Sequence, residues 1–244
     1  MKVLIIYAHP EPKSFNSALK NKAFQILSGE GHDIQVSDLY AMKWKAVADK
    51  DDFTQLENED FLKYQVEQKK GNLKEDILQE QKKVEWADLI IFQFPLWWFG
   101  IPAILKGWLD RVLTSGWAYS YPNIYDKGPF VQKKVLISTT TGGPEFLYSK
   151  QGLNGDLSQI FFPFLHSFYF CGFQVLEPEF FWSPTENKEK RKLYLKRWIK
   201  RLKQIDKEEV IPFSKMGEYT ELTSLKKPDI DFMKRPKKTD EKKK

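Results

Sequence analysis

Three short loops carry residue types that could bind a ligand, and each follows an apolar run typical of a buried strand. The first loop, AHPEPKSFNSA, leads into a helix whose N-terminus would offer free backbone N–H groups and a partial positive charge to a phosphate. His9, Ser14 and Asn16 add side-chain donors there. When this loop is considered alone, Ser14 is better explained as a helix cap only, and His9 as an ordinary loop residue.

The second loop, PLWWFGIP, places Trp97, Trp98 and Phe99 just before a helix that begins at Pro102. All three rings cannot be buried under that helix, so part of their surface should line a crevice suited to a flat heteroaromatic ring. Core packing or a subunit interface explains the same residues equally well when this loop is considered alone.

The third loop contains Thr140, Thr141, Gly142 and Gly143, with Tyr148 shortly after. Two glycines let the backbone approach a ligand closely and expose its N–H groups. Such donors, aimed at the polar edge of a flavin, would stabilise the negative charge of its reduced form.

Alternating strands and helices must position these loops. Apolar and alternating runs predict strands over residues 2–8, 32–39, 88–95, 133–139 and 172–181. Helical spacing predicts helices over residues 14–31 and 74–87, from Pro102, and over 186–205, with a shorter helical piece in the charged segment 40–72. This order predicts a doubly wound α/β fold, a five-stranded parallel sheet in three layers. Ligands bind such sheets at the carboxyl ends of the strands, so the three loops should converge there.

Length and charge limit the remaining classes. The 244 residues suit one sizeable core over residues 1–205, followed by an extension over 206–244. Nine Lys or Arg and four Asp or Glu lie between Lys226 and Lys244, which accounts for five units of the net charge of +6. We expect this end to be disordered and solvated, and we expect no nucleic-acid partner.

No apolar run is long enough for a membrane span or a signal peptide, so we expect a cytoplasmic protein.

The single cysteine, Cys171, excludes an internal disulfide and is expected to pack in the core. No metal site is expected. The first loop has neither G-x-G-x-x-G nor G-K-[ST], and no residue pattern separates NADH from NADPH as a ligand.

Six segments together resemble one family, the flavin-dependent NAD(P)H:quinone oxidoreductases of the flavodoxin-like fold, often called DT-diaphorase or quinone reductase. They cover most of residues 1–202 and read AHPEPKSFNSAL, SDLYAM, ADLIIFQFPLWWFGIPAILKGWLDRVL, WAYSY, TTGGPEFLYSKQGLNGD and FCGFQVLEP. The resemblance implies two-electron reduction of a quinone by ping-pong hydride transfer from NADH or NADPH. The cofactor would be FAD, with FMN as the alternative, and the active site would be shared within a homodimer.

The resemblance also implies a role for each matching position. Tyr148 would assist hydride transfer, with Asn154 beside it. The flavin would be held by His9, Ser14, Phe15, Asn16, Pro95, Leu96, Trp97, Trp98, Phe99, Thr140, Thr141, Gly142, Gly143 and Tyr148, with Arg191 near the adenine end. The aromatic substrate pocket would be formed by Tyr119, Tyr121 and Phe170, in this family partly from the other subunit.

The chain also departs from the family pattern. Asn154 stands where mammalian members have a histidine, and asparagine cannot accept a proton at neutral pH. Asp110 replaces a glutamate, and Trp97 is an additional tryptophan. Two other functions stay open, a flavoprotein subunit that regulates a membrane transporter and a flavodoxin-type electron carrier.

Overall fold

The computed structural model describes residues 1–218. Its internal contacts divide the chain into a first unit, Met1–Ile211, and a second unit from Pro212 onward. The predicted disordered end, Lys226 to Lys244, lies outside the described residues. None of the helices within residues 1–218 is both long and apolar enough to cross a bilayer.

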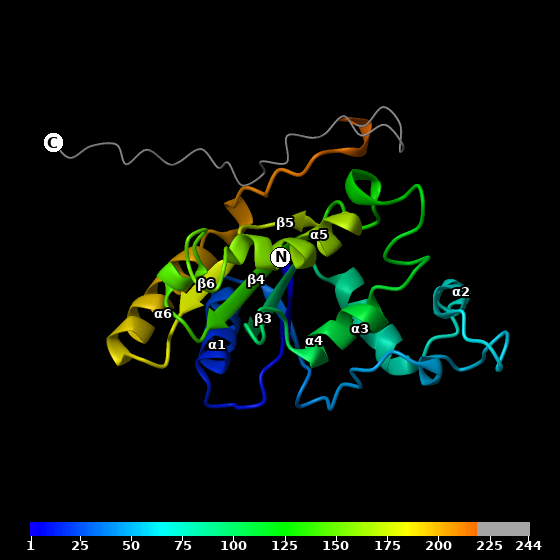
Figure 1. Ribbon diagram of the computed structural model, residues 1–244, viewed down its shortest axis with the longest axis horizontal. Coiled ribbons are helices and arrows are strands. Elements are labelled where there is room, and N and C mark those ends of the chain that lie inside the picture. The colour runs from blue at the N-terminus through cyan, green and yellow to red at the C-terminus, as the bar shows by residue number, and fades with distance from the viewer. Residues whose placement is uncertain (219–244) are drawn as a thin grey trace. The chain divides into compact units, whose positions relative to one another are not determined.

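The first unit is built on a parallel sheet (Figure 1). Its strands are β1 (Lys2–Tyr7), β2 (Asp33–Asp38), β3 (Leu89–Pro95), β4 (Lys134–Thr141), β5 (Gln174–Val175) and β6 (Glu179–Trp182). The order is β2-β1-β3-β4-β5, and β6 also pairs with β4. The predicted doubly wound parallel fold is therefore confirmed, with one difference at its last strand.

That last strand is interrupted. The sequence predicts one strand over residues 172–181, whereas the structure has β5 beside the start of β4 and β6 beside its end. Pro178 lies in the gap and has no N–H to donate to the ladder, which explains why the chain leaves the sheet there.

Helices cover both faces of the sheet. They are α1 (Phe15–Gly29), α2 (Tyr64–Lys70), α3 (Glu75–Trp86), α4 (Ala103–Val112), α5 (Leu157–Phe170) and α6 (Lys188–Leu202). On one face α1 and α6 lie side by side, and Val3, Ile5 and Ile91 pack against them (Figure 1). Neighbouring strand positions point to the other face, where Phe92 contacts Trp108 of α4 at 5.7 Å between ring centroids. This alternation has the period of two expected for strands buried on both sides.

Helix α5 was not predicted. Its sequence, LSQIFFPFLHSFYF, is almost uniformly apolar and contains Pro163, so it shows little of the periodicity that marks an amphipathic helix. Asp156 caps its start by accepting a hydrogen bond from the Ser158 N–H at 3.0 Å.

The charged segment before α3 is anchored by a buried ion pair. Arg111 of α4 donates to Asp52 at 2.9 Å, and both side chains are almost fully buried. Tyr64 also donates to Asp52, at 2.6 Å, and burial raises the pKa of Tyr64. Gly107 lets α4 approach this segment closely, because a Cβ there would lie 2.0 Å from the Ala46 carbonyl oxygen.

Cys171 is buried beside two glycines at the end of α5, as expected for a core residue. Burial raises the pKa of its thiol to about 12, so the thiolate that a nucleophile needs is scarce at neutral pH.

Candidate functional site

The three ligand-competent loops leave the same edge of the sheet, at the carboxyl ends of β1, β3 and β4. Two backbone hydrogen bonds hold them together: Ala8 N–H donates to the Gln93 carbonyl at 3.0 Å, and Leu96 N–H donates to the Thr140 carbonyl at 2.8 Å. The predicted convergence of the loops is therefore present.

The first loop presents the N-terminus of α1. Ser14 is its cap, and its Oγ accepts the Ser17 N–H at 3.1 Å. The N–H groups of Phe15 and Asn16 have no hydrogen-bond acceptor within the helix, so they are free to donate to an anion. The ring of Phe15 packs edge-on against Phe181 at 6.0 Å, so only its backbone is placed to bind a ligand.

His9 lies between this loop and the aromatic loop. Its Nδ1 accepts the Glu11 N–H at 3.0 Å, and its ring is 6.2 Å from that of Trp97. Burial lowers the pKa of His9, so the free protein carries a neutral ring at pH 7. Because Nδ1 is an acceptor, the proton lies on Nε2, which can donate to an anion.

A buried chain of hydrogen bonds connects the three loops. Asn16 donates to Thr140 Oγ1 at 2.8 Å and accepts from Gln93 at 2.8 Å, while Gln93 accepts from Ser138 at 2.7 Å. All four side chains are buried. The Asn16 side chain is therefore used within the protein, and Gln93 and Ser138 support the site although the sequence did not single them out.

The aromatic loop is a tight turn. Trp97 and Gly100 exchange backbone hydrogen bonds at 3.0 and 2.9 Å, with Trp98 and Phe99 between them. Their φ angles are 50° and 57°, the left-handed region that bulky residues avoid at a cost of about 1–3 kcal/mol each. Trp98 is 98% exposed and Phe99 52%. The fold thus holds two aromatic side chains in solvent at the ligand-binding edge, against both local strain and the hydrophobic effect.

The glycine loop brings Tyr148 and Asn154 together. A Cβ on Gly143 would lie 3.2 Å from the Tyr148 ring and 3.6 Å from the Asn154 side-chain nitrogen. A Cβ on Gly142, in contrast, would meet nothing within 4 Å, so the backbone there is open to a ligand. The two predicted catalytic residues therefore share one wall of the site.

Two residues that the sequence did not single out support this wall. Ser183, fully buried, donates from N–H to the Thr141 carbonyl at 3.0 Å and from Oγ to the Gly142 carbonyl at 3.2 Å. The Trp182 ring lies 5.6 Å from that of Tyr148. Trp182 ends β6 and Ser183 follows it, and that place at the carboxyl edge is the signal that could have found them.

Arg191 lies in the first turn of α6, which also begins at the carboxyl edge. Its guanidinium donates to the Pro184 carbonyl at 2.9 Å and so holds the loop that leads into α6.

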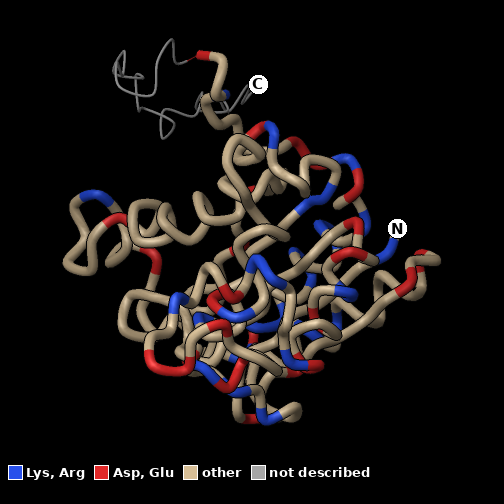
Figure 2. Tube along the Cα trace, turned by 90° about the vertical axis from the view of Figure 1, so that its right-hand side faces the viewer, with Lys and Arg blue, Asp and Glu red and all other residues tan. Residues whose placement is uncertain are grey.

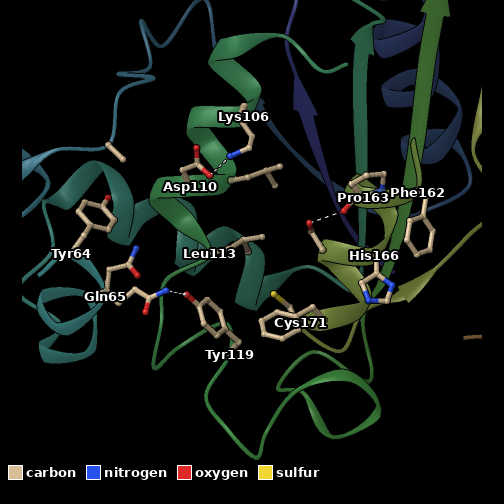
Figure 3. A pocket seen from close by; sticks show the side chains of 15 residues that line it. Tyr64, Gln65, Lys106, Asp110, Leu113, Tyr119, Phe162, Pro163, His166 and Cys171 are labelled. Carbon is tan, nitrogen blue, oxygen red and sulfur yellow. Dashed lines mark hydrogen bonds and ion pairs between the residues drawn. The ribbon is translucent and has the colours of Figure 1, made fainter. Parts of the chain in front are cut away.

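The three predicted substrate-pocket residues are not brought to these loops. Tyr119 and Tyr121 lie between α4 and β4, and Phe170 ends α5, so all three lie towards the amino edge of the sheet. The rings of Tyr119 and Phe170 are 5.2 Å apart and line a cavity of about 830 Å³ between α2, α4 and α5 (Figure 3). Gln65 donates to the Tyr119 hydroxyl at 3.3 Å at its rim, whereas Tyr121 is largely exposed.

The carboxyl edge fits a flavin. It combines a capped helix N-terminus for a phosphate, exposed aromatic rings for a flat ring system and an open glycine backbone for the polar ring edge. The Glu11 carboxylate in the first loop accepts the Lys13 N–H at 2.7 Å.

Comparison with known proteins identifies the family of the chain. A family model described as the flavodoxin-like fold matches residues 1–202. The human ribosyldihydronicotinamide dehydrogenase [quinone] is 50% identical over 218 residues, covering 86% of this chain and 94% of that protein. The rat NAD(P)H dehydrogenase [quinone] 1 is 46% identical over 220 residues, covering 87% and 80%.

A solved structure is similar throughout the same region. A Klebsiella pneumoniae protein assigned as a quinone reductase superposes with a TM-score of 0.85 at 42% identity, covering 88% of each chain. With the family model spanning most of the chain and relatives near half identical, the chain belongs to the flavodoxin-like NAD(P)H quinone oxidoreductases.

Proposed function

We propose that this quinone oxidoreductase binds FAD at the carboxyl edge of its sheet and that nicotinamide and quinone use one aromatic site in turn. The observation that carries this proposal is the Trp97–Gly100 turn, which keeps Trp98 and Phe99 exposed beside the glycine loop. A flavin bound here would supply the two-electron chemistry that connects a reduced nicotinamide to a quinone.

Different residues of the chain bind different parts of the cofactor. The N–H groups of Phe15 and Asn16, with His9 Nε2–H, bind phosphate oxygens, and Ser14 keeps the helix end in place. Backbone N–H groups near Gly142 and Gly143 donate to the polar ring edge. Arg191, at the start of α6, is the residue that we expect near the adenine end of FAD, which FMN lacks.

We infer that Tyr148, whose ring lies against Gly143, donates a hydrogen bond to the ring edge of the cofactor. Its hydroxyl would stabilise negative charge that develops there during reduction. Asn154 contributes a neutral donor next to it, so it can orient a bound quinone oxygen but cannot relay a proton as a histidine would.

We infer that the aromatic wall on the far side of the ligand comes from a second subunit. Tyr119 and Phe170 lie at the amino edge, and α5 alone, with 14 residues at 1.5 Å each, spans about 21 Å between the glycine loop and Phe170. One subunit therefore does not bring both groups to one ring, whereas a symmetric homodimer can place them together across its interface.

The proposed donor is NADH or NADPH, and the proposed location is the cytoplasm. The names of the relatives above include both an NAD(P)H and a ribosyldihydronicotinamide donor. A donor comparison therefore belongs in the first experiment.

That experiment is an anaerobic absorbance titration of the purified protein, after any bound flavin has been released and identified. NADH, NADPH and ribosyldihydronicotinamide are added separately, followed by menadione. Bleaching by a nicotinamide and recovery on menadione would support the proposal, and parallel double-reciprocal plots would support one shared site. A bound flavin that no donor reduces would favour a carrier or a regulatory subunit instead.

The phosphate position has its own test in a matched pair of variants. Aspartate and asparagine both cap helices as well as serine does, so Ser14→Asp and Ser14→Asn should retain stability. Only Ser14→Asp adds a negative charge at the proposed phosphate position. We expect it to lower flavin affinity at least about fivefold relative to Ser14→Asn, since a pair of like charges nearby costs about 1 kcal/mol or more. Equal affinities would place the phosphate elsewhere.

A further inference from the structure

Basic side chains are concentrated on the helical layer formed by α1 and α6, which lies on the opposite face of the sheet from α3, α4 and α5. These two helices hold ten Lys and Arg and one acidic residue, Glu189, a net charge of +9. The whole chain has 39 basic and 33 acidic residues, so all other residues together carry 29 and 32, a net charge of −3. Figure 2, seen from the side of α2 and α3, shows both signs interspersed there.

Most of the exposed charged side chains of this layer are lysines. Lys192, Lys196 and Lys200 follow one another at four-residue spacing and therefore share one face of α6. Lys22 of α1 is partly exposed on the neighbouring helix, which is tied to α6 by a hydrogen bond from Trp198 Nε1 to the Leu19 carbonyl at 3.1 Å. Within the described residues, four lysines of the layer make no ion pair: Lys22, Lys188, Lys196 and Lys200.

Carboxylates near the layer neutralise other members of it. Asp38 lies 3.8 Å from Lys20, Glu30 3.0 Å from Lys203 beyond the end of α6, and Glu189 2.8 Å from Lys192. Glu186 pairs with Lys190 at the start of α6. These ion pairs lie at the rim and the ends of the layer. The positive charge of the lysines at its centre is therefore not neutralised by a neighbouring carboxylate.

The arginines of α6, by contrast, already form ion pairs or hydrogen bonds within the protein. Arg197 and Arg201 both pair with Glu179, at 2.7 and 2.8 Å, and Arg191 holds the Pro184 carbonyl. Arginine is the residue that recognises single phosphates in a fixed bidentate geometry, and lysine acts as a mobile point charge. The layer therefore presents diffuse positive charge rather than a set of specific phosphate sites.

Each of the two helices also exposes one large apolar side chain, and Leu193 lies between Lys192 and Lys196 in the sequence of α6. Phe24 of α1 is 47% exposed, and Leu193 of α6 is 64% exposed. A helix that lies in a membrane interface combines lysines, which attract anionic headgroups, with apolar side chains that enter the acyl boundary. We propose that the α1–α6 layer is a docking surface for the anionic face of a lipid bilayer.

Vesicle co-sedimentation of the full-length holoprotein tests this proposal. Phosphatidylcholine vesicles are compared with vesicles that also contain phosphatidylserine, at low and at raised salt. A lysine near an anionic leaflet strengthens partitioning by roughly fivefold, so a triple variant, Lys22→Gln, Lys196→Gln and Lys200→Gln, should bind about 100-fold more weakly. The matched control replaces three exposed lysines of other segments, Lys63, Lys74 and Lys82, by glutamine and should bind as the wild type does.

A Leu193→Ser variant tests the apolar contribution to membrane binding. Its partitioning into phosphatidylserine vesicles should fall even at low salt. Reduction of the bound flavin by NADH in solution reports correct folding and should stay unchanged in all variants. Several outcomes would overturn the proposal: no binding to phosphatidylserine vesicles, unchanged binding in the first triple variant, or an equal loss in both triple variants. Salt-sensitive binding of duplex DNA that depends on the same lysines, without vesicle binding, would reassign the layer to nucleic acid.

Discussion

At the level of single residues, the side chains around the glycine loop divide into those that face a ligand and those that hold others in place. In the proposed site, Tyr148 and Asn154 belong to the first group because both lie against Gly143, next to the open backbone at Gly142. Gln93, Asn16 and Ser138 belong to the second group, because their polar side-chain atoms form hydrogen bonds with one another inside the protein. The two groups should respond differently to mutation.

Replacing Tyr148 by phenylalanine should slow flavin reduction. Loss of one hydrogen bond to developing charge is worth about 1–3 kcal/mol, which corresponds to roughly 10- to 100-fold in rate. Flavin content should not change, because the phenyl ring that remains in the variant keeps the packing on Trp182 and Gly143. Stopped-flow mixing with NADH measures the step, and an unaltered rate constant would remove the hydroxyl from the mechanism.

Replacing Gln93 by methionine should instead lower stability. Methionine has a similar length but leaves Asn16 Oδ1 and Ser138 Oγ without their buried partner, at a cost of about 1–3 kcal/mol. Gln79→Met on the exposed side of α3 is the control and should change the free energy of unfolding by less than about 0.5 kcal/mol. Urea denaturation compares the two, and equal midpoints would show that the buried chain contributes little.

Residue roles differ in how far sequence alone could predict them. The three loops and their residue types were sufficient to propose a binding edge, because parallel strands place their carboxyl ends together. The use of Asn16 as a link between Gln93 and Thr140 depends on contacts between positions 77 and 124 residues apart, which no local pattern contains. The exposed, left-handed Trp98 and Phe99 were expected only in part, since local preferences disfavour that conformation.

At the level of elements, sequence periodicity predicted most of the sheet and the amphipathic helices, and it was least informative where burial is uniform. Helix α5 is apolar on nearly all sides and contains Pro163, so its period is hidden. The break between β5 and β6 follows from Pro178, a local signal that was present but was not used.

The packing of α4 on the segment before α3 gives an element-level prediction. Gly107→Ala puts a methyl group 2.0 Å from the Ala46 carbonyl oxygen, so the backbones must separate. We expect a loss of about 1–3 kcal/mol or more in the free energy of unfolding, which outweighs the gain of about 1 kcal/mol in helix propensity.

Gly29→Ala is the matched control for that variant. It lies at the end of α1, where an added Cβ would meet nothing within 4 Å. The control should be neutral or slightly stabilised in thermal or urea unfolding. If the Gly107→Ala protein were as stable as the control, the segment around Ala46 would be able to move away from α4 with no loss in the free energy of unfolding.

At the level of the whole molecule, the described chain separates the two halves of its proposed site. The flavin loops lie at the carboxyl edge of the sheet, and Tyr119 and Phe170 line a cavity towards the amino edge (Figure 3). Sequence resemblance implied a shared site, but only the placement of these residues along the fold gives a physical reason for it.

Mixed dimers test that arrangement. A Ser14→Asp subunit binds flavin more weakly but keeps Phe170, whereas a Phe170→Ala subunit keeps the flavin loops but lacks part of the aromatic wall. In a shared-site dimer, one of the two sites of the mixed species combines intact loops from one subunit with an intact Phe170 from the other. We therefore expect co-refolded mixtures to reduce menadione faster than the sum of the separate variants, up to half the wild-type rate per mixed dimer. If each subunit formed a complete site by itself, mixing would give no gain, and the amino-edge cavity would have to serve another purpose.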